Sequence, residues 1–284
     1  MTISLIICTR NRAEPLSRCL AAVAAIVHDD DWELVVVDNG STDGTLAVIR
    51  SFAKIHDLHV VAVSQPVAGL SNARNAGVAA ARGDLILFTD DDCYVAPDLL
   101  DAARAAFADP AIGFVTGRVR LFDPDDALVT INESTVPERF PARAFLATGL
   151  VKGANLGFRR TALDGIAPAG QPFDPLLGAG ARFPAGEDSD AAQRVALAGW
   201  AGAYDPAMVV FHHHGRRKAD IAGLYQGYDV GRGAFHAKLL TLSGGFRAGL
   251  RAWAGLPSRV RARPALLVGE LRGALGYWRA QLLR

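Results

Sequence analysis

Cysteine and long apolar runs are both scarce in this chain of 284 residues. The three cysteines, Cys8, Cys19 and Cys93, lack the close pairing of a zinc site, and an odd number favours a reducing compartment. Met1 leads directly into a strand-like apolar run, which leaves no room for a secretory leader. No run reaches the roughly 18 apolar residues of a membrane-spanning helix. We therefore expect a cytoplasmic protein without a membrane span.

Two glycine-dependent nucleotide signatures are also missing. The turn that follows the first apolar run, Thr9–Glu14, has no glycine, which argues against a dinucleotide fold. No Gly-Lys-Ser/Thr triplet occurs anywhere, so a P-loop is excluded. The turn instead offers the hydroxyl of Thr9 and the guanidinium groups of Arg10 and Arg12. These donors suit a nucleotide's base, ribose or phosphates, although either arginine would also fit a solvated helix start.

Charge is nearly balanced overall, at +1, but it is unevenly distributed along the chain. Residues 216–284 hold 13 Lys and Arg against 3 Asp and Glu, a net charge of +10. Residues 1–215 hold 17 against 26, a net charge of −9. Basic tails favour anionic membrane surfaces or nucleic acid. We expect one acidic domain at 1–215 and a basic, helical extension at 216–284.

Short apolar strands alternate with helical patterns through the first ninety residues. Ser71 is expected to cap the third of these helices, and the first carries a stripe that ends at Val27. The alternation predicts an α/β fold with a mostly parallel central sheet flanked by helices. The expected strands are Ile3–Cys8, Glu33–Val37, Leu58–Val63 and Asp84–Thr89.

Three consecutive carboxylates, Asp90, Asp91 and Asp92, follow the last of these strands. Their mutual repulsion is explained if they bind a hard divalent cation such as Mg²⁺ or Mn²⁺, which such sites share with substrate phosphates. The alternative is a solvated acidic turn ahead of a helix. Ligands of parallel α/β sheets bind at the carboxyl ends of the strands. Thr9 and Asp38 fall at the same kind of position, although Asp38 could also simply bond its own turn.

Further acidic and imidazole groups occur in the second half of the chain. Glu187 and Asp188 begin a helix, where they could serve the macrodipole or, aimed at the cleft, a general base. A short strand, Val209–Phe211, precedes three histidines, any of which could ligate a metal or be a hydrogen-bonded strand end.

Taken in order, these segments resemble the family 2 glycosyltransferases, which are inverting enzymes with the GT-A fold that use nucleotide sugars. The resemblance runs from Ile3 to about Gly215. The segments that carry it are Ile7–Arg12, Val37–Asp43, Ala73–Gly77, Thr89–Asp92, Gly153–Asn155, Gly186–Asp190 and the histidines at 212–214.

The resemblance implies a role for each matching residue. The implied donor-binding residues are Thr9, Arg10, Arg12, Asp38, Arg74, Asp90 and Asp91. The metal, Mg or Mn, would be held by Asp92 and Asp90, with His212 or His214. Asp188 resembles the base that deprotonates the acceptor hydroxyl, and Glu187 and Asn155 lie on the acceptor side.

The implied reaction moves one sugar from a nucleotide-sugar donor to a glycan, lipid-linked or small-molecule hydroxyl, as in the synthesis of bacterial cell-surface glycans or glycolipids. The Gln-x-x-Arg-Trp motif of the processive synthases is absent, since Gln193-Arg194 lacks its spacing. A nucleotidyltransferase or a non-catalytic sugar-nucleotide-binding protein remains an alternative.

The basic extension is expected to be helical over Ile221–Leu242, Phe246–Trp253 and Leu266–Leu283. Leucines spaced three or four apart, together with Trp278, form one stripe on the last helix. That stripe would pack on the domain or a second subunit, as a homodimer, or it would dock peripherally on an anionic membrane. Nucleic acid is not expected as a partner, because the basic residues lack interleaved stacking aromatics.

Overall fold

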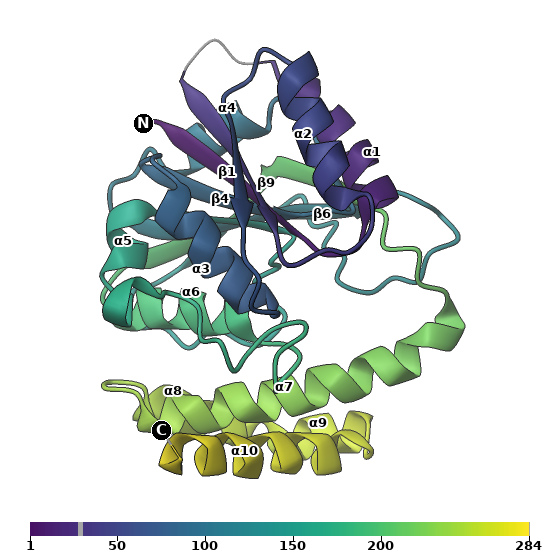
Figure 1. The fold of residues 1–284 in the computed structure, drawn as a ribbon. Coiled ribbons are helices and arrows are strands. Elements are labelled where there is room, and N and C mark those ends of the chain that lie inside the picture. The colour runs from purple at the N-terminus through teal and green to yellow at the C-terminus, as the bar shows by residue number, and fades with distance from the viewer. Residues whose placement is uncertain (28–30, 284) are drawn as a thin grey trace.

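The computed structural model describes residues 1–27 and 31–283, so Arg284, the end of the expected extension, lies outside it. A nine-stranded sheet runs through the molecule, with helices on both faces and a further helical layer from the C-terminal quarter (Figure 1). The predicted α/β class is thereby confirmed. The strands are β1 (Ile3–Thr9), β2 (Trp32–Asp38), β3 (Val60–Ser64), β4 (Leu85–Asp90), β5 (Cys93–Val95), β6 (Ile112–Leu121), β7 (Glu138–Phe140), β8 (Asn155–Arg159) and β9 (Ala201–His212).

Helices alternate with strands from β1 to β4, less regularly from there to β9, and four more α-helices follow among the described residues. Those of the first part are α1 (Ala13–Ala24), α2 (Thr45–Ile55), α3 (Leu70–Ala80), α4 (Leu99–Ala106), α5 (Arg160–Asp164) and α6 (Glu187–Leu197). Those of the C-terminal layer are α7 (Ile221–Thr241), α8 (Phe246–Ala254), α9 (Leu256–Ala262) and α10 (Leu266–Leu282).

The sheet order is β3-β2-β1-β4-β8-β6-β9-β5, with β7 paired to β9. The strands β3, β2, β1 and β4 are parallel, and β8 joins β4 in the antiparallel direction. Parallel pairing places Thr9 opposite Asp38 and Cys8 opposite Asp90. The carboxyl ends of β1, β2 and β4 therefore meet at one edge, as the sequence predicted.

Alternate side chains of each strand enter two different cores. Leu5 and Leu87 pack with α1, α2 and α4 on one face, and Ile6 and Phe88 pack with α3, α5 and α6 on the other. The approach of α3 to β1 is close, because a Cβ built on Gly77 would lie 2.7 Å from the Ile6 side chain. Both faces of the central strands are buried, which accounts for their continuous apolar runs.

The C-terminal helices form one layer beneath the α6 side of the sheet (Figure 1). The contact between α7 and α10 is nearly backbone to backbone: a Cβ on Gly233 would lie 1.9 Å from the Glu270 carbonyl oxygen, and one on Gly273 would lie 2.0 Å from that of Val230. On its other side α7 meets the start of α6, where a Cβ on Gly231 would lie 2.6 Å from Ala185 O. The layer is therefore packed tightly on the segment that begins α6.

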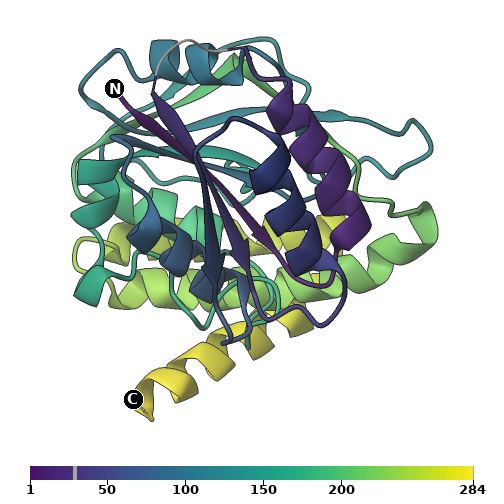
Figure 2. The same ribbon diagram turned by 45° about the horizontal axis from the view of Figure 1, so that its top comes forward.

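The apolar stripe predicted on the last helix does not pack on the domain, so that alternative is wrong. The buried face of α10 instead consists of Leu266 at its start, Tyr277, and small or polar residues such as Glu270 and Gly273. Leu271 and Trp278 of the stripe are 44% and 39% exposed. At its C-terminal end α10 extends past the rest of the chain (Figure 2).

Smaller differences from the predicted elements follow from tertiary contacts. β9 is much longer than Val209–Phe211, because β6 pairs with most of it. Val27 lies beyond α1 and is exposed. Ser71 does not cap α3; it lies inside the helix and donates to Leu177 O. Among residues 1–27 and 31–283, no helix is both long enough and apolar enough to cross a membrane.

Candidate active site

The first turn of the chain is held by the carboxylates that follow β4. Thr9 Oγ1 donates to Asp91 Oδ2 at 2.6 Å, and Arg12 Nε donates to Asp91 Oδ1 at 2.7 Å. Arg12 Nη2 also donates to Asp92 Oδ2 at 2.7 Å. Two of the three predicted carboxylates thus fix the β1–α1 turn, in which Asn11 adopts a positive φ of 53°.

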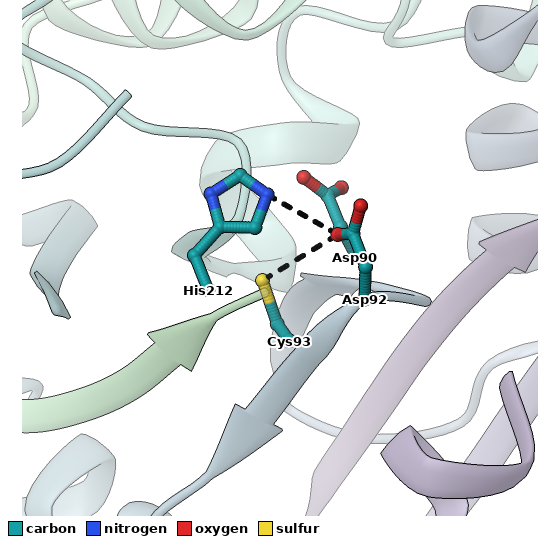
Figure 3. Close-up of side chains that lie close together, drawn as sticks. All are labelled: Asp90, Asp92, Cys93 and His212. Carbon is teal, nitrogen blue, oxygen red and sulfur yellow. Dashed lines mark hydrogen bonds and ion pairs between the residues drawn. The ribbon is translucent and has the colours of Figure 1, made fainter. Parts of the chain in front are cut away.

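The second group centres on Asp92 (Figure 3). Its Oδ1 lies 3.2 Å from His212 Nε2, and Cys93 Sγ points toward the same oxygen at 4.0 Å. One ligand atom each from Asp90, Asp92, Cys93 and His212 lies within 4.8 Å of the others. The cluster forms because β5 pairs with β9 in register, Cys93 opposite His212.

The carboxylates of the triplet differ in their electrostatics. Burial raises the pKa of Asp91 to about 6, although Arg12 and the Thr9 hydroxyl act against it. Burial also raises the pKa of Asp90, opposed by Arg74 and reinforced by Asp92. For Asp92, burial is outweighed by the hydrogen bond and charge of His212, so its pKa is lowered. A raised pKa means that the protein stabilises the charged form of the carboxylate poorly, and a bound cation would supply that stabilisation.

These residues fit a divalent cation. Two carboxylates and an imidazole are suitable ligands for Mn²⁺ or Mg²⁺. The thiol of Cys93 is a poor ligand for such a hard cation, and burial raises its pKa well above the usual value. Asp90, Asp92 and His212 are therefore the residues that would hold the metal.

A buried arginine connects this cluster to the start of α6. Arg74 Nη1 donates to Glu187 Oε1 at 3.0 Å, and its Nη2 lies 3.8 Å from Asp90 Oδ1. Burial raises the pKa of Glu187 to about 7, with the charge of Asp188 adding to the effect and Arg74 opposing it. The guanidinium is itself only 3% exposed and lies over the rings of Phe88 and Phe173.

Each carboxylate oxygen of Asp188 accepts a hydrogen bond from a different backbone N–H group. Its Oδ2 accepts from Gly153 N at 3.0 Å, and its Oδ1 accepts from Ser189 N at 2.6 Å. Gly153 cannot be replaced easily, because a Cβ there would lie 2.6 Å from Arg74 Nη2 and 3.3 Å from Asp188 Oδ2. The contact between the turn that precedes β8 and the start of α6 thus fixes the orientation of the predicted base.

A cavity of about 750 Å³ joins these groups. Most of the predicted site residues line it: Thr9, Arg10, Arg12, Arg74, Asp90, Asp91, Asp92, Glu187, Asp188 and His212. Its size and its mixture of apolar walls with convergent polar groups are those of a small-molecule site.

Three predicted residues are not brought to the cavity lining. Asp38 Oδ1 accepts from Ser41 N at 3.1 Å, although its neighbour Asn39 lines the cavity. Asn155 is buried and donates to Arg118 O and Met208 O, which ties β8 to β6 and β9. His214 is engaged at both ring nitrogens by the backbone, Nε2 with Ala127 O at 3.0 Å and Nδ1 with Arg216 N at 3.0 Å.

The residues of one cavity wall were not predicted from the sequence. Tyr225, Tyr228 and Arg232 of α7 line it, as do Arg216 and Lys152. The spacing of the three α7 residues places them on one helical face, which is the signal that could have found them. Neither Arg216 nor Lys152 has an ion pair with a carboxylate in the part of the chain that the structure describes.

Comparisons with known proteins identify a family, similar sequences and similar folds. The sequence model of the family described as Glycosyl transferase family 2 matches residues 4–165. A curated relative, glycosyltransferase AglE of Haloferax volcanii, is 26% identical over 167 residues, which cover 58% of this chain and 55% of the relative. Another, the poly(ribitol-phosphate) beta-glucosyltransferase of Bacillus spizizenii, is 32% identical over 103 residues, 35% of this chain and 16% of the relative. The chain spans about half the length of the first of these relatives.

Two solved structures share the fold. One is the mannosyltransferase PcManGT from Pyrobaculum calidifontis in complex with GDP-Man and Mn²⁺, with a TM-score of 0.69, 25% identity, and coverage of 98% of this chain and 75% of that one. The other is S. aureus TarS 1-349 in complex with UDP-GlcNAc, with a TM-score of 0.67, 17% identity, and coverage of 93% and 73%. With a family model that matches more than half of its residues, the chain belongs to glycosyl transferase family 2.

Proposed function

We propose that this chain transfers one sugar from a nucleotide-sugar donor to an acceptor hydroxyl, with inversion at the anomeric carbon. The observation that supports this best is a single cavity in which the carboxylate cluster at the strand ends faces the carboxylates that begin α6. PcManGT, in complex with GDP-Man and Mn²⁺, shares the fold, which is consistent with donor and metal binding at this edge of the sheet.

The donor half of the proposed site is the edge formed by β1, β2 and β4. Thr9, Arg10 and Arg12 lie at the first turn, and Arg74 and Asp90 lie deeper in the cavity. Asp38 does not line the cavity, but it lies beside Asn39, which does. Its Oδ2 has no hydrogen-bonding partner among the described residues, so we still propose it as a contact to the donor's ribose or base. The guanidinium of Arg10 likewise makes no ion pair within the described chain, so it is available for phosphate.

The leaving group of the reaction is a nucleoside diphosphate, whose developing charge must be neutralised. A bound Mg²⁺ or Mn²⁺, held by Asp90, Asp92 and His212, would supply part of that neutralisation. Arg216 adds a positive charge from the chain itself, since it lines the cavity and lowers the pKa of Asp92. Besides any contact with the donor, Arg12 holds the carboxylates of Asp91 and Asp92 in place.

The acceptor half of the proposed site is the start of α6. Asp188 accepts the proton of the acceptor hydroxyl while the oxygen attacks the anomeric carbon from the side opposite the leaving group. One attack of this kind inverts the configuration and requires no covalent intermediate. Gly153 N and Ser189 N hold the two carboxylate oxygens, and Glu187 is engaged by Arg74. Asp188 is therefore oriented by its neighbours.

We propose that the acceptor is a glycan, lipid-linked or small-molecule hydroxyl in the synthesis of cell-surface glycans. The poly(ribitol-phosphate) beta-glucosyltransferase among the relatives supports this range. We also propose that the chain divides into a domain at 1–215 and a helical extension at 216–284, and that the extension contributes to the site. Tyr225 and Tyr228 of the extension line the cavity opposite the donor half.

A donor screen tests the proposal. The purified chain is incubated with a panel of nucleotide sugars, with Mn²⁺, Mg²⁺ or EDTA, while thermal unfolding and slow donor hydrolysis are followed. We expect one donor to raise Tm only with metal and to yield its nucleoside diphosphate. Asp92→Asn should abolish the metal-dependent rise in Tm. Asp57→Asn is the control, at an exposed position between α2 and β3, and should preserve that rise.

Two results would contradict the proposal. Release of pyrophosphate would make the chain a nucleotidyltransferase. A donor that binds without metal and is never turned over, with any acceptor, would favour a non-catalytic binding protein.

A further inference from the structure

The surface of α10 that faces solvent is strongly apolar. Val268, Leu271, Leu275, Trp278 and Leu282 are 73%, 44%, 53%, 39% and 85% exposed. Their spacing of three and four residues places them on one face of the helix. On the shorter helix α8, the exposed pair Phe246 and Leu250 has the same spacing. An apolar stripe of this length on a protein surface marks an interaction site.

The opposite face of α10 shows why the leucines remain outside. Glu270 is fully buried there, and its carboxylate accepts from Arg232 Nε at 2.6 Å and from Arg259 Nη2 at 2.9 Å. Gly273 allows the backbone of α7 to approach. The tight contact between the two helices therefore uses the small and charged side of α10, and the apolar side has no partner within the described chain.

The charges around the stripe have a single sign. Arg272 and Arg279 flank it on α10, and both are exposed. Between residues 242 and 283 the one acidic residue is Glu270, which is buried between two arginines. The exposed charged side chains of this segment are all arginines: Arg247, Arg251, Arg261, Arg272 and Arg279. A surface of leucines and arginines without carboxylates complements an anionic, apolar layer.

We propose that α10, with the helices beside it, docks on the surface of an anionic lipid bilayer. An interfacial helix combines an apolar face with flanking cations in this way, and each cation near an anionic surface strengthens binding. A second copy of the chain fits less well. A two-fold interface would place Arg272 and Arg279 against the same residues of the other copy, with no carboxylate between them.

If the proposed function holds, docking also bears on the kind of acceptor used. The docking itself does not depend on the proposed function. α7 carries Tyr225 and Tyr228 on the cavity wall and packs on α10. Both α7 and α10 would thus lie between the cavity and the lipid headgroups, a separation of about two helix diameters, roughly 20 Å. Docking would hold the chain close to a lipid-linked acceptor, whereas it would bring no such benefit for a freely diffusing acceptor.

Vesicle co-sedimentation of the full chain tests the proposal. We expect binding to vesicles of phosphatidylcholine with about one third phosphatidylglycerol, little binding to phosphatidylcholine alone, and weakening by salt. The triple variant Leu271→Ser/Leu275→Ser/Trp278→Ser should lose at least about tenfold in partitioning. Arg272→Gln and Arg279→Gln should each weaken it by about fivefold.

A matched control uses exposed apolar residues outside the helical layer. The triple variant Val27→Ser/Ile55→Ser/Val136→Ser removes side chains that are 73%, 76% and 68% exposed and should bind vesicles as the unaltered chain does. Thermal unfolding of each variant establishes that it is folded. No sedimentation with either vesicle, or an equal loss in the control, would overturn the proposal. So would a dimer in solution that the α10 variant dissociates without changing vesicle binding. Donor turnover is measured separately, so failure of docking and failure of the transferase activity can be told apart.

Discussion

Two regions of the molecule bury acidic side chains, and they do so with opposite results. In the cavity, burial raises the pKa values of Asp90, Asp91 and Glu187. Glu270 of the C-terminal layer and Asp174, which contacts that layer through Lys238, are buried as well, but arginine and lysine partners outweigh the desolvation, and their pKa values are lowered.

The difference lies in pairing and not in burial. Lys238 Nζ donates to both Asp174 and Asp190, at 3.0 and 2.8 Å, and Arg232 and Arg259 share Glu270. The layer thus completes its charge pairs within the described chain. The cavity leaves charge of both signs incomplete, in its carboxylates and in Arg216. Incomplete pairing at a concave surface indicates where a charged ligand is bound.

The largest expected effect breaks the comparison on its cavity side. Asp188→Asn keeps an oxygen for Gly153 N but removes the base, so sugar transfer should fall by about 10²–10⁴-fold. Tm should fall only slightly, because the amide NH2 of the variant costs the hydrogen bond from Ser189 N, but no ion pair among the described residues is removed. The measurement is the initial rate of nucleoside diphosphate release with acceptor. Transfer at the unaltered rate would exclude Asp188 as the base.

The next effect breaks the comparison on the side of the helical layer. Lys238→Met removes the cation between Asp174 and Asp190 and leaves both carboxylates buried, which should lower the free energy of unfolding by about 3–5 kcal/mol. Lys54→Met, at an exposed position near the end of α2, is the matched control and should change it by less than about 0.5 kcal/mol. Denaturant titration measures both. Equal, small changes would show that the layer does not depend on its pairs.

The third prediction concerns His236, a titratable side chain that is buried in the C-terminal layer and forms no ion pair among the described residues. His236 is 1% exposed beside Trp253, and burial lowers its pKa to about 3. The unfolded chain takes up this proton near pH 6.5 and the folded chain only near 3. The stability that this difference provides is complete above pH 6.5 and is lost as the pH falls toward 3.

Acid should therefore destabilise the unaltered chain more than His236→Phe. At pH 5 the loss that depends on His236 is about 2 kcal/mol. Chemical unfolding of both proteins at pH 7.5 and pH 5 measures it, with His59→Gln, at a side chain that is 54% exposed, as the control. The same pH dependence in all three proteins would contradict a buried neutral imidazole.

The smallest expected effect concerns the cations of the two regions. Arg216→Gln should raise the KM for the donor by about tenfold, because a charge-assisted contact with phosphate is lost. Arg50→Gln, on the exposed face of α2, should leave KM unchanged. Stability should be unaffected in both, since the Arg216 side chain makes no ion pair in the chain as described. A loss of stability without a change in KM would place Arg216 with the structural arginines instead.

Much of this architecture could be predicted from the residues. Continuous apolar runs identified the four parallel strands. Burial on both faces requires such runs in β1, β2 and β4, whereas β3 lies at the edge of the sheet and is only partly buried. Polar residues after those runs identified the edge where ligands bind. The α7 wall could not be found in this way. Tyr225 and Tyr228 meet the cavity only because Gly231 lets α7 approach Ala185, a contact between segments 46 residues apart in number.

The C-terminal helix shows the other limit. Hydrophobic periodicity correctly predicted a helix with a leucine stripe, but not which side is buried. Burial of Glu270 depends on two guanidinium groups outside α10, one of them on α7. The sequence pattern of α10 alone therefore could not predict it. His214 and Asn155 were similarly diverted by backbone carbonyl groups that only the folded chain supplies.

The order of the strands also governs how the chain is assembled during synthesis. Leu5 of β1 pairs with Leu87 of β4, so the centre of the sheet closes only after about eighty further residues have been made, which takes about 4–16 s at ordinary rates of translation. His212 must then be made before it can reach Asp92, and α7 follows later still. The parallel part of the sheet, β1 to β4, can thus form before His212 joins the carboxylates that follow β4. Nascent chains that end before α7 would present the Ala185 surface uncovered, as a target for chaperones.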